Sequence, residues 1–337
     1  MFEVEKRNRS HYIAEGAIMS SVAALLGLLG IYFPPLSIVT NLVWLVPLII
    51  ITMRWDIKRG LMSLLISGLL MGVLSSPVDA LLLLVEYGGL ALVYGYSFQK
   101  MHKLEKTLLR GILTAALGSI LMIALSIGIL GFNPSDLLAE MQNASMSTVS
   151  FYEETGMMAR FEEQGISREQ VMDIAERVGA TMVLILPSIM VVLAMITAIV
   201  SLMVTRGVLS RLKIPVPQKL PPFREWKLDF RFVYGFIAGL LAFLAGDYWQ
   251  LSMLSTLGIN LLVAFGFIFS LQGLAVLISL FTGFKAKPFV RIFMVALLVL
   301  YAQVMIYLLL FVGLFDEFFD YRKRLRKKGD KDEGHSE

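Results

Sequence analysis

Long runs of apolar residues are the feature of this sequence that most restricts its fold. The runs are about 17–28 residues long with few charges, which is the length of helix that crosses a roughly 30 Å hydrocarbon core. Hydrophobic residues make up 57% of the 337 residues and charged residues only 17%, against about 45–50% and 25% in soluble domains. The strands of a transmembrane β-barrel would be about ten residues long and alternating. The sequence therefore predicts an all-α, polytopic membrane bundle of eight or nine helices.

Proline-rich breaks separate several of these runs. Pro34-Pro35 follows the first run, and Ser75-Ser76-Pro77 separates the third from the fourth. Proline removes a backbone donor and disfavours helix in the residue before it, so both breaks predict tight turns. We place candidate spans at residues 12–33, 36–53, 61–76, 79–98, 111–132, 181–205, 232–247, 254–282 and 290–314.

The distribution of Lys and Arg predicts the orientation in the membrane. Basic residues gather at the N-terminus, near residues 54–59 and 100–110, and in 206–231, which has seven basic residues against two acids. By the positive-inside rule these segments face the cytoplasm. Residues 133–180 hold nine acids and three Arg and fit the outer face. The protein is therefore expected in a bacterial plasma membrane, as a multi-pass protein with a cytoplasmic N-terminus.

The side of the C-terminal tail is left open by the sequence. Three further spans after 206–231 would place the tail outside, yet six basic residues cluster between Tyr321 and Gly329, and such clusters favour the cytoplasm. One of the last runs would then be re-entrant or interfacial, or the rule fails here. The charges favour the alternative in which the tail faces the cytoplasm.

The same patterns predict a division of the chain into segments. Ser167 with Gln170 three residues later is typical of a capping box, so 133–180 is expected to contain amphipathic helices, acting either as a lid or as a simple connection. The predicted segments are a six-helix membrane unit (1–205) that includes the extracytoplasmic segment 133–180, a cytoplasmic Pro-rich basic connector (206–231), C-terminal membrane helices (232–315) and a charged tail (316–337).

The sequence lacks the usual motifs of enzymes and of metal or nucleotide sites. It has no cysteine and only three histidines, which lie far apart. It contains no G-x-x-x-x-G-K-[ST], no H-E-x-x-H and no G-x-S-x-G, so we expect no enzyme activity, no cofactor and no metal. The net charge of +4 gives no indication of nucleic-acid binding, and the expected environment is the lipid bilayer.

Four residues within the apolar runs are candidates for a substrate-binding site. Glu86 lies about midway along its run and is followed by Tyr87, while Asn41 and Trp44 lie one turn apart in the second run. Polar groups in hydrocarbon are costly and are therefore functional candidates by default. A carboxylate at that depth needs a partner, a proton or a polar ligand. Asn41 can instead bond a neighbouring helix, and the sequence leaves both possibilities open.

A stripe of small residues runs along the first apolar run. Gly16, Ser20 and Ala24 recur at every fourth position, with Ala23 and Gly27 beside them. Small residues at this spacing let two helix backbones approach closely within a membrane, where hydrophobicity alone does not drive association. The stripe predicts either close packing inside this chain or docking onto a partner protein.

The chain as a whole resembles the YybS-like family of uncharacterised bacterial membrane proteins. The resemblance rests on EGAIMSSVAALLGLLGIYFP, LVWLVPLIIITMRWDIKRG, NLLVAFGFIFSLQGLAVLISLF and VGLFDEFFDYRKR, which extend over nearly the full length. That family is distantly similar to the substrate-binding S components of energy-coupling factor transporters. The similarity implies a six-helix unit whose first helix docks, through small residues, on a coupling subunit driven by ATPases. Gly16, Ser20 and Ala24 would be the docking face, although only Ala24 is an alanine in that register.

Two functions follow from these observations. The first is an S-component-like protein that captures a small solute, with Asn41, Trp44, Glu86 and Tyr87 in its cavity and partner ATPases supplying energy. The alternative is a non-transporting scaffold of the cell envelope that binds protein partners through small-residue helix faces. Solute capture predicts a closed, partly polar pocket near Glu86 in the outer half of the six-helix unit. A scaffold predicts tightly packed helices whose polar groups pair with one another.

Overall fold

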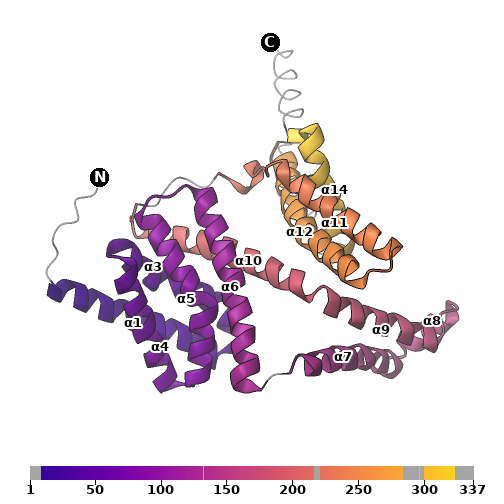
Figure 1. Cartoon of the computed structure of the whole chain (residues 1–337), viewed down its shortest axis with the longest axis horizontal. Coiled ribbons are helices and arrows are strands. Elements are labelled where there is room, and N and C mark those ends of the chain that lie inside the picture. The colour runs from indigo at the N-terminus through magenta and orange to yellow at the C-terminus, as the bar shows by residue number, and fades with distance from the viewer. Residues whose placement is uncertain (1–8, 132, 216–220, 284–295, 297–299, 323–337) are drawn as a thin grey trace, which may run out of the picture. The chain divides into compact units, whose positions relative to one another are not determined.

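The structure is a computed structural model that describes residues 9–131, 133–215, 221–283, 296 and 300–322 (Figure 1). Helices account for nearly all of these residues, and no strand occurs among them. The all-α fold predicted from the apolar runs is therefore confirmed. The chain forms two compact units: unit 1 contains Met1–Glu140 and Leu193–Lys219, and unit 2 contains Met141–Val192 and Leu220–Glu337.

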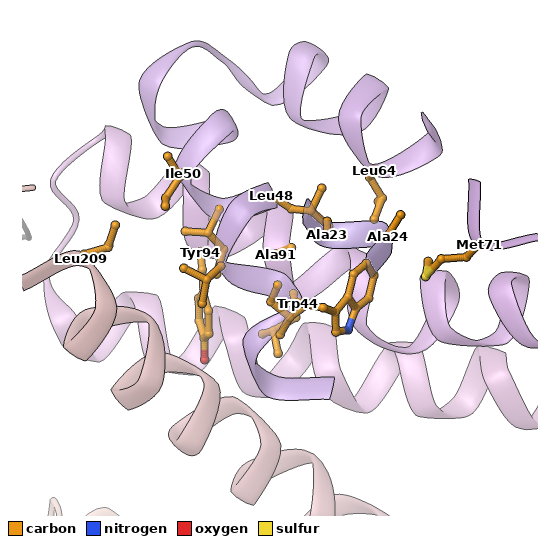
Figure 2. Packing of buried hydrophobic residues seen from close by; sticks show 14 of the residues in the cluster. Ala23, Ala24, Trp44, Leu48, Ile50, Leu64, Met71, Ala91, Tyr94 and Leu209 are labelled. Carbon is orange, nitrogen blue, oxygen red and sulfur yellow. The ribbon is translucent and has the colours of Figure 1, made fainter. Parts of the chain in front are cut away.

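A central buried helix organises unit 1. The helix α3 (Leu45–Arg54) buries every residue from Leu45 to Thr52, because its sequence is apolar on all sides and α1, α4 and α5 pack around it. Figure 2 shows part of the buried cluster beside it, including Trp44, Leu48 and Tyr94. The other elements are α1 (Arg9–Tyr32), η1 (Pro34–Leu36), α2 (Ser37–Val43), α4 (Ile57–Leu74), α5 (Pro77–Gln99), α6 (Leu104–Leu130) and the C-terminal part of α10 (Leu186–Arg211).

Local sequence signals set the ends of these helices. The predicted second span is divided at Trp44 into α2 and α3, where Pro47 can supply no N–H to the preceding turn. The Asp56 side chain accepts a hydrogen bond from the backbone N–H of Arg59 and caps α4, and Ser76 caps α5 in the same way. Gly131 ends α6 in the left-handed conformation, with φ of 66°, which glycine adopts without steric cost.

Unit 2 contains the amphipathic segment and the C-terminal helices. The predicted capping box is present, with Ser167 and Gln170 exchanging hydrogen bonds at the start of α9. The helix α9 continues to Leu184 and α10 begins at Leu186, so the sixth span starts later than the predicted residue 181. The elements are α7 (Pro134–Glu154), which begins in unit 1, α8 (Met157–Glu163), α9 (Arg168–Leu184), the start of α10, η2 (Phe223–Glu225), α11 (Arg231–Tyr248), α12 (Ser252–Gly283) and α14 (Ala302–Phe319).

Seven of the described helices are long and apolar enough to cross a membrane, by length and composition: α1, α4, α5, α6, α10, α11 and α12. The segment Val39–Arg54 is a shorter apolar helix. Large apolar side chains such as Leu25, Leu69 and Leu113 are exposed on the surfaces of these helices, as contact with lipid requires. The predicted span 290–314 lies partly outside the described residues. The helix found there, α14, begins at Ala302 and extends beyond 314 to Phe319.

Candidate functional site

A partly polar cavity lies in unit 1, among α1, α2, α5 and α6. Its volume is about 400 Å³ and it is open to the surroundings, whereas the sequence had predicted a closed pocket. The cavity lies toward the helix ends opposite the basic loops, because Ile31 is near the end of α1 and Asp79 is near the start of α5. Its lining residues are Ile31, Asn41, Asp79, Leu82, Leu83, Glu86, Tyr87 and Met122.

Helix periodicity brings most of the lining together. Asp79, Leu82, Leu83 and Glu86 follow one another at helical spacing on α5 and therefore share one face of it. Helix α6 comes close to this helix at Gly118, where an added Cβ would overlap the backbone carbonyl oxygen of Glu86. One turn beyond Gly118, Met122 reaches the cavity.

Three of the four predicted site residues meet at this cavity. The Tyr87 side chain interacts with the side chains of both Glu86 and Asn41. The Asn41 Oδ1 atom is buried and has no hydrogen-bond partner in the described part of the chain. Within that same part, Glu86 makes no ion pair. The cavity thus holds an amide, a phenol and the carboxyl groups of Glu86 and Asp79, and its lining contains no Lys, Arg or His.

Trp44 is the predicted site residue that does not line the cavity. Its side chain is 0% exposed and belongs to the buried cluster around α3. Figure 2 shows the indole ring among these core residues, near Ala24. Asp79 and Met122 are lining residues that the sequence analysis did not assign to the site. Asp79 could have been assigned to the site from the sequence, because it lies two helical turns before Glu86 in the same apolar run.

The small-residue stripe on α1 faces another helix of the same chain. Gly16, Ser20 and Ala24 are all buried, and α1 packs against α4. A Cβ added at Gly16 would lie 3.7 Å from the Ser63 hydroxyl oxygen, and one added at Gly27 would overlap Met71. Internal packing, which the sequence had left open, accounts for this face. Partner docking through it stays a prediction and would require α1 to separate from α4.

Other charged groups of unit 1 lie at the end that carries the basic loops. The Glu15 carboxylate pairs with the Arg54 guanidinium and accepts a hydrogen bond of 3.0 Å from the Trp55 indole N–H. This interaction ties α1 to the end of α3, so Glu15 has a structural role. In the described part of the chain, no cluster of three His, Asp or Glu side chains is arranged to hold a metal ion.

Comparison with known proteins places the chain among uncharacterised membrane proteins. Residues 21–317 match the model of a family described as "Predicted membrane protein (DUF2232)". The chain is similar to "Uncharacterized protein YybS" of Bacillus subtilis (strain 168), with 25% identity over 274 residues that cover 78% of this chain and 82% of the relative. No solved structure matches. The YybS-like resemblance is confirmed, whereas the more distant similarity to S components stays a prediction.

Proposed function

This chain belongs to the DUF2232 family of predicted membrane proteins, and we propose that it captures a small, positively charged solute at the cavity of unit 1. The observation that carries the proposal is the convergence of Asn41, Glu86 and Tyr87 on one open cavity. Asn41 lies on α2, whereas Glu86 and Tyr87 are adjacent on α5, and close packing of the bundle alone gives no reason for a carboxyl group and an amide to meet there.

The lining supports a cationic solute with an apolar part. Glu86 and Asp79 contribute carboxyl groups, and the lining holds no basic side chain to neutralise them. A charge in a low-dielectric site is costly unless it is paired, and a protonated amine from the solute would supply that partner. Ile31, Leu82, Leu83 and Met122 offer apolar contacts. The volume of about 400 Å³ falls within the roughly 300–1,000 Å³ range of small-molecule sites.

Energy for uptake would come from other proteins. The sequence contains no P-loop, so in this proposal a coupling subunit and ATPases of the energy-coupling factor type drive transport. Because Gly16, Ser20 and Ala24 pack against α4, such a coupling subunit would meet another surface unless α1 moves. The scaffold hypothesis, in contrast, expects paired polar groups, and Asn41 Oδ1 does not fit that expectation among the described residues.

Native mass spectrometry of the full chain, purified in mild detergent from bacterial membranes, tests the proposal. We expect the wild-type protein to retain a small molecule that carries an amine or another cationic group. Glu86→Gln keeps the side-chain shape but removes the charge, and it should abolish this retention. Glu105→Gln is the matched control, because Glu105 is an exposed carboxylate near the start of α6, outside the cavity.

Three results would argue against solute capture of this kind. The first is that the wild-type protein retains no small molecule. The second is that the retained molecule is anionic. The third is that Glu86→Gln retains the molecule as well as the wild-type protein does. Recovery of envelope proteins alone, without any small molecule, would favour the scaffold.

A further inference from the structure

Helices α12 and α14 of unit 2 run in the same direction. Gly266 packs against Leu310, Phe269 against Gly313, and Gln272 bonds Asp316. In these three pairs the residue numbers on both helices rise together, as they do in parallel neighbours. Two further contacts, Ser270 with Ile306 and Gly273 with Leu309, have a smaller offset between the two numbers, and Gly273 with Gly313 lies between the two sets. In contrast, α11 and α12 are antiparallel. Their contact pairs, in which one number falls as the other rises, are Gly235 with Phe265, Gly239 with Leu261 and Gly246 with Ser255.

The directions of these helices bring three parts of unit 2 together: the C-terminal part of α12, the end of α14 and the segment that precedes α11. Since α12 runs back toward the level where α11 begins, and α14 runs with α12, the end of α14 reaches the segment that precedes α11. This segment is residues 221–230, which belong to the C-terminal half of the predicted connector. It contacts α12 through η2.

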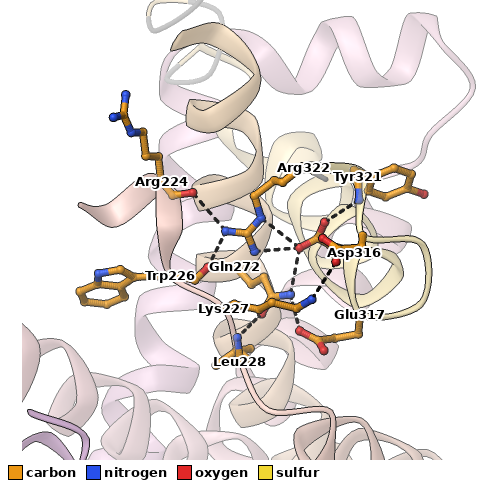
Figure 3. Close-up of polar contacts among 10 residues, drawn as sticks. Arg224, Trp226, Lys227, Leu228, Gln272, Asp316, Glu317, Tyr321 and Arg322 are labelled. Carbon is orange, nitrogen blue, oxygen red and sulfur yellow. Dashed lines mark hydrogen bonds and ion pairs between the residues drawn. The ribbon is translucent and has the colours of Figure 1, made fainter. Parts of the chain in front are cut away.

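A buried polar cluster, which we call the connector clamp, joins these ends (Figure 3). The Arg322 guanidinium pairs with the Asp316 carboxylate at 2.8 Å. The same guanidinium donates hydrogen bonds to the backbone carbonyls of Arg224 at 3.1 Å and Trp226 at 2.7 Å. Gln272 accepts a hydrogen bond of 2.9 Å from the backbone N–H of Leu228. We define the connector clamp as Arg224, Trp226, Leu228, Gln272, Asp316, Glu317 and Arg322.

The buried charges of the connector clamp have partners among its own members and in the backbone of Tyr321. Asp316 is 0% exposed and Arg322 is 9% exposed, so each charge requires a partner within the protein. The second Asp316 oxygen accepts a hydrogen bond from the backbone N–H of Tyr321 at 3.1 Å, and the Gln272 amide donates to Glu317 at 2.5 Å. Outside the clamp, Lys227 pairs with Asp320 at 3.4 Å. Loss of either Asp316 or Arg322 would leave the other buried charge without its ionic partner.

We infer that the connector clamp holds the start of the C-terminal tail on the same side of the membrane as the connector. The parallel course of α12 and α14 places Gly283, the last residue of α12, and Ala302, the first residue of α14, at opposite ends of this helix pair. The connector has seven basic residues against two acids, and the tail has six basic residues between Tyr321 and Gly329. Both then face the cytoplasm, as the positive-inside rule requires.

Cysteine labelling of the full chain tests the inference, because the sequence contains no cysteine of its own. Ser336→Cys reports on the tail, Ser210→Cys on the exposed end of α10 within the connector, and Ser147→Cys on the exposed surface of α7. Each variant is treated with a membrane-impermeant maleimide in intact cells and after permeabilisation. We expect Ser336→Cys and Ser210→Cys to react only after permeabilisation and Ser147→Cys to react in intact cells. Opposite accessibility of Ser336→Cys and Ser210→Cys would overturn the inference.

A cross-link tests the connector clamp separately from the topology. Lys227 and Asp320 are half exposed, so Lys227→Cys with Asp320→Cys should leave the fold intact and form a short cross-link within one chain. The control pair is Lys227→Cys with Asp247→Cys, since Asp247 is exposed at the far end of α11. Failure of the first pair to link, or equal linking by both pairs, would contradict the arrangement of the clamp. Neither experiment depends on the cavity of unit 1.

Discussion

At the scale of single residues, Asp316 is the buried charge with the clearest energetic role. Asp316→Asn keeps the side-chain shape but leaves the Arg322 guanidinium with carbonyl acceptors alone. Removing one partner of a buried ion pair costs about 3–5 kcal/mol, so we expect a lower midpoint of thermal unfolding in detergent. Asp229→Asn is the control, because the Asp229 carboxylate is 60% exposed and lies 3.9 Å from Arg231. Exposed pairs contribute about 0–1 kcal/mol. Equal midpoints for the two variants would show that the pair is not buried as described.

Single residues also show how far the sequence predicts the candidate site. Glu86, Tyr87 and Asn41 were predictable because a polar group within an apolar run needs a partner, and they do meet at one cavity. The polarity of a residue does not tell in which direction its side chain points, however. Trp44, at the break between α2 and α3, is buried in the core and does not line the cavity. Asp316 and Arg322 were expected to be part of a charged tail. Their burial depends on α12 and the connector, which lie far away in the sequence.

At the scale of elements, the packing of α1 on α4 gives a matched pair of substitutions. Ser20 is 0% exposed within the stripe that faces α4, whereas the next residue, Ser21, is exposed. Ser20→Leu adds volume at a fully buried position, and overpacking of this kind costs about 1–3 kcal/mol. Ser21→Leu adds the same side chain toward lipid. We expect Ser20→Leu to lower the yield of monodisperse protein in size-exclusion chromatography and Ser21→Leu to leave it unchanged.

The same pair separates internal packing from partner docking. If Ser20→Leu gives a normal yield of folded protein but loses a co-purifying membrane protein, the stripe serves a partner rather than α4. The sequence predicted that this face would meet a helix, because small residues recur along it. It left the identity of that helix open, because α4 carries its own small residues, Ser63 and Ser67, which are equally suited to a partner within the chain or outside it.

At the scale of the whole molecule, run length predicted most of the membrane-crossing helices, whereas charge left the side of the C-terminal tail open. Apolar runs of membrane-crossing length identify helices because hydrocarbon requires every backbone group to be bonded within its own segment. The boundaries followed from prolines and caps such as Ser76 and Ser167. The parallel contacts between α12 and α14 are visible only in three dimensions.

The absolute orientation can be tested on membrane vesicles with trypsin. Arg177 in α9 has a side chain that is 78% exposed, and Lys213, just beyond α10, is exposed as well. With a cytoplasmic N-terminus, the two sites lie on opposite faces of the membrane, separated by α10. We therefore expect trypsin to cut after Arg177 in right-side-out vesicles and after Lys213 in inside-out vesicles, as identified by mass spectrometry of the fragments. The reversed pattern would mean that the basic loops of unit 1 face outward, and the cavity would then open toward the cytoplasm, where it could not capture a solute from outside.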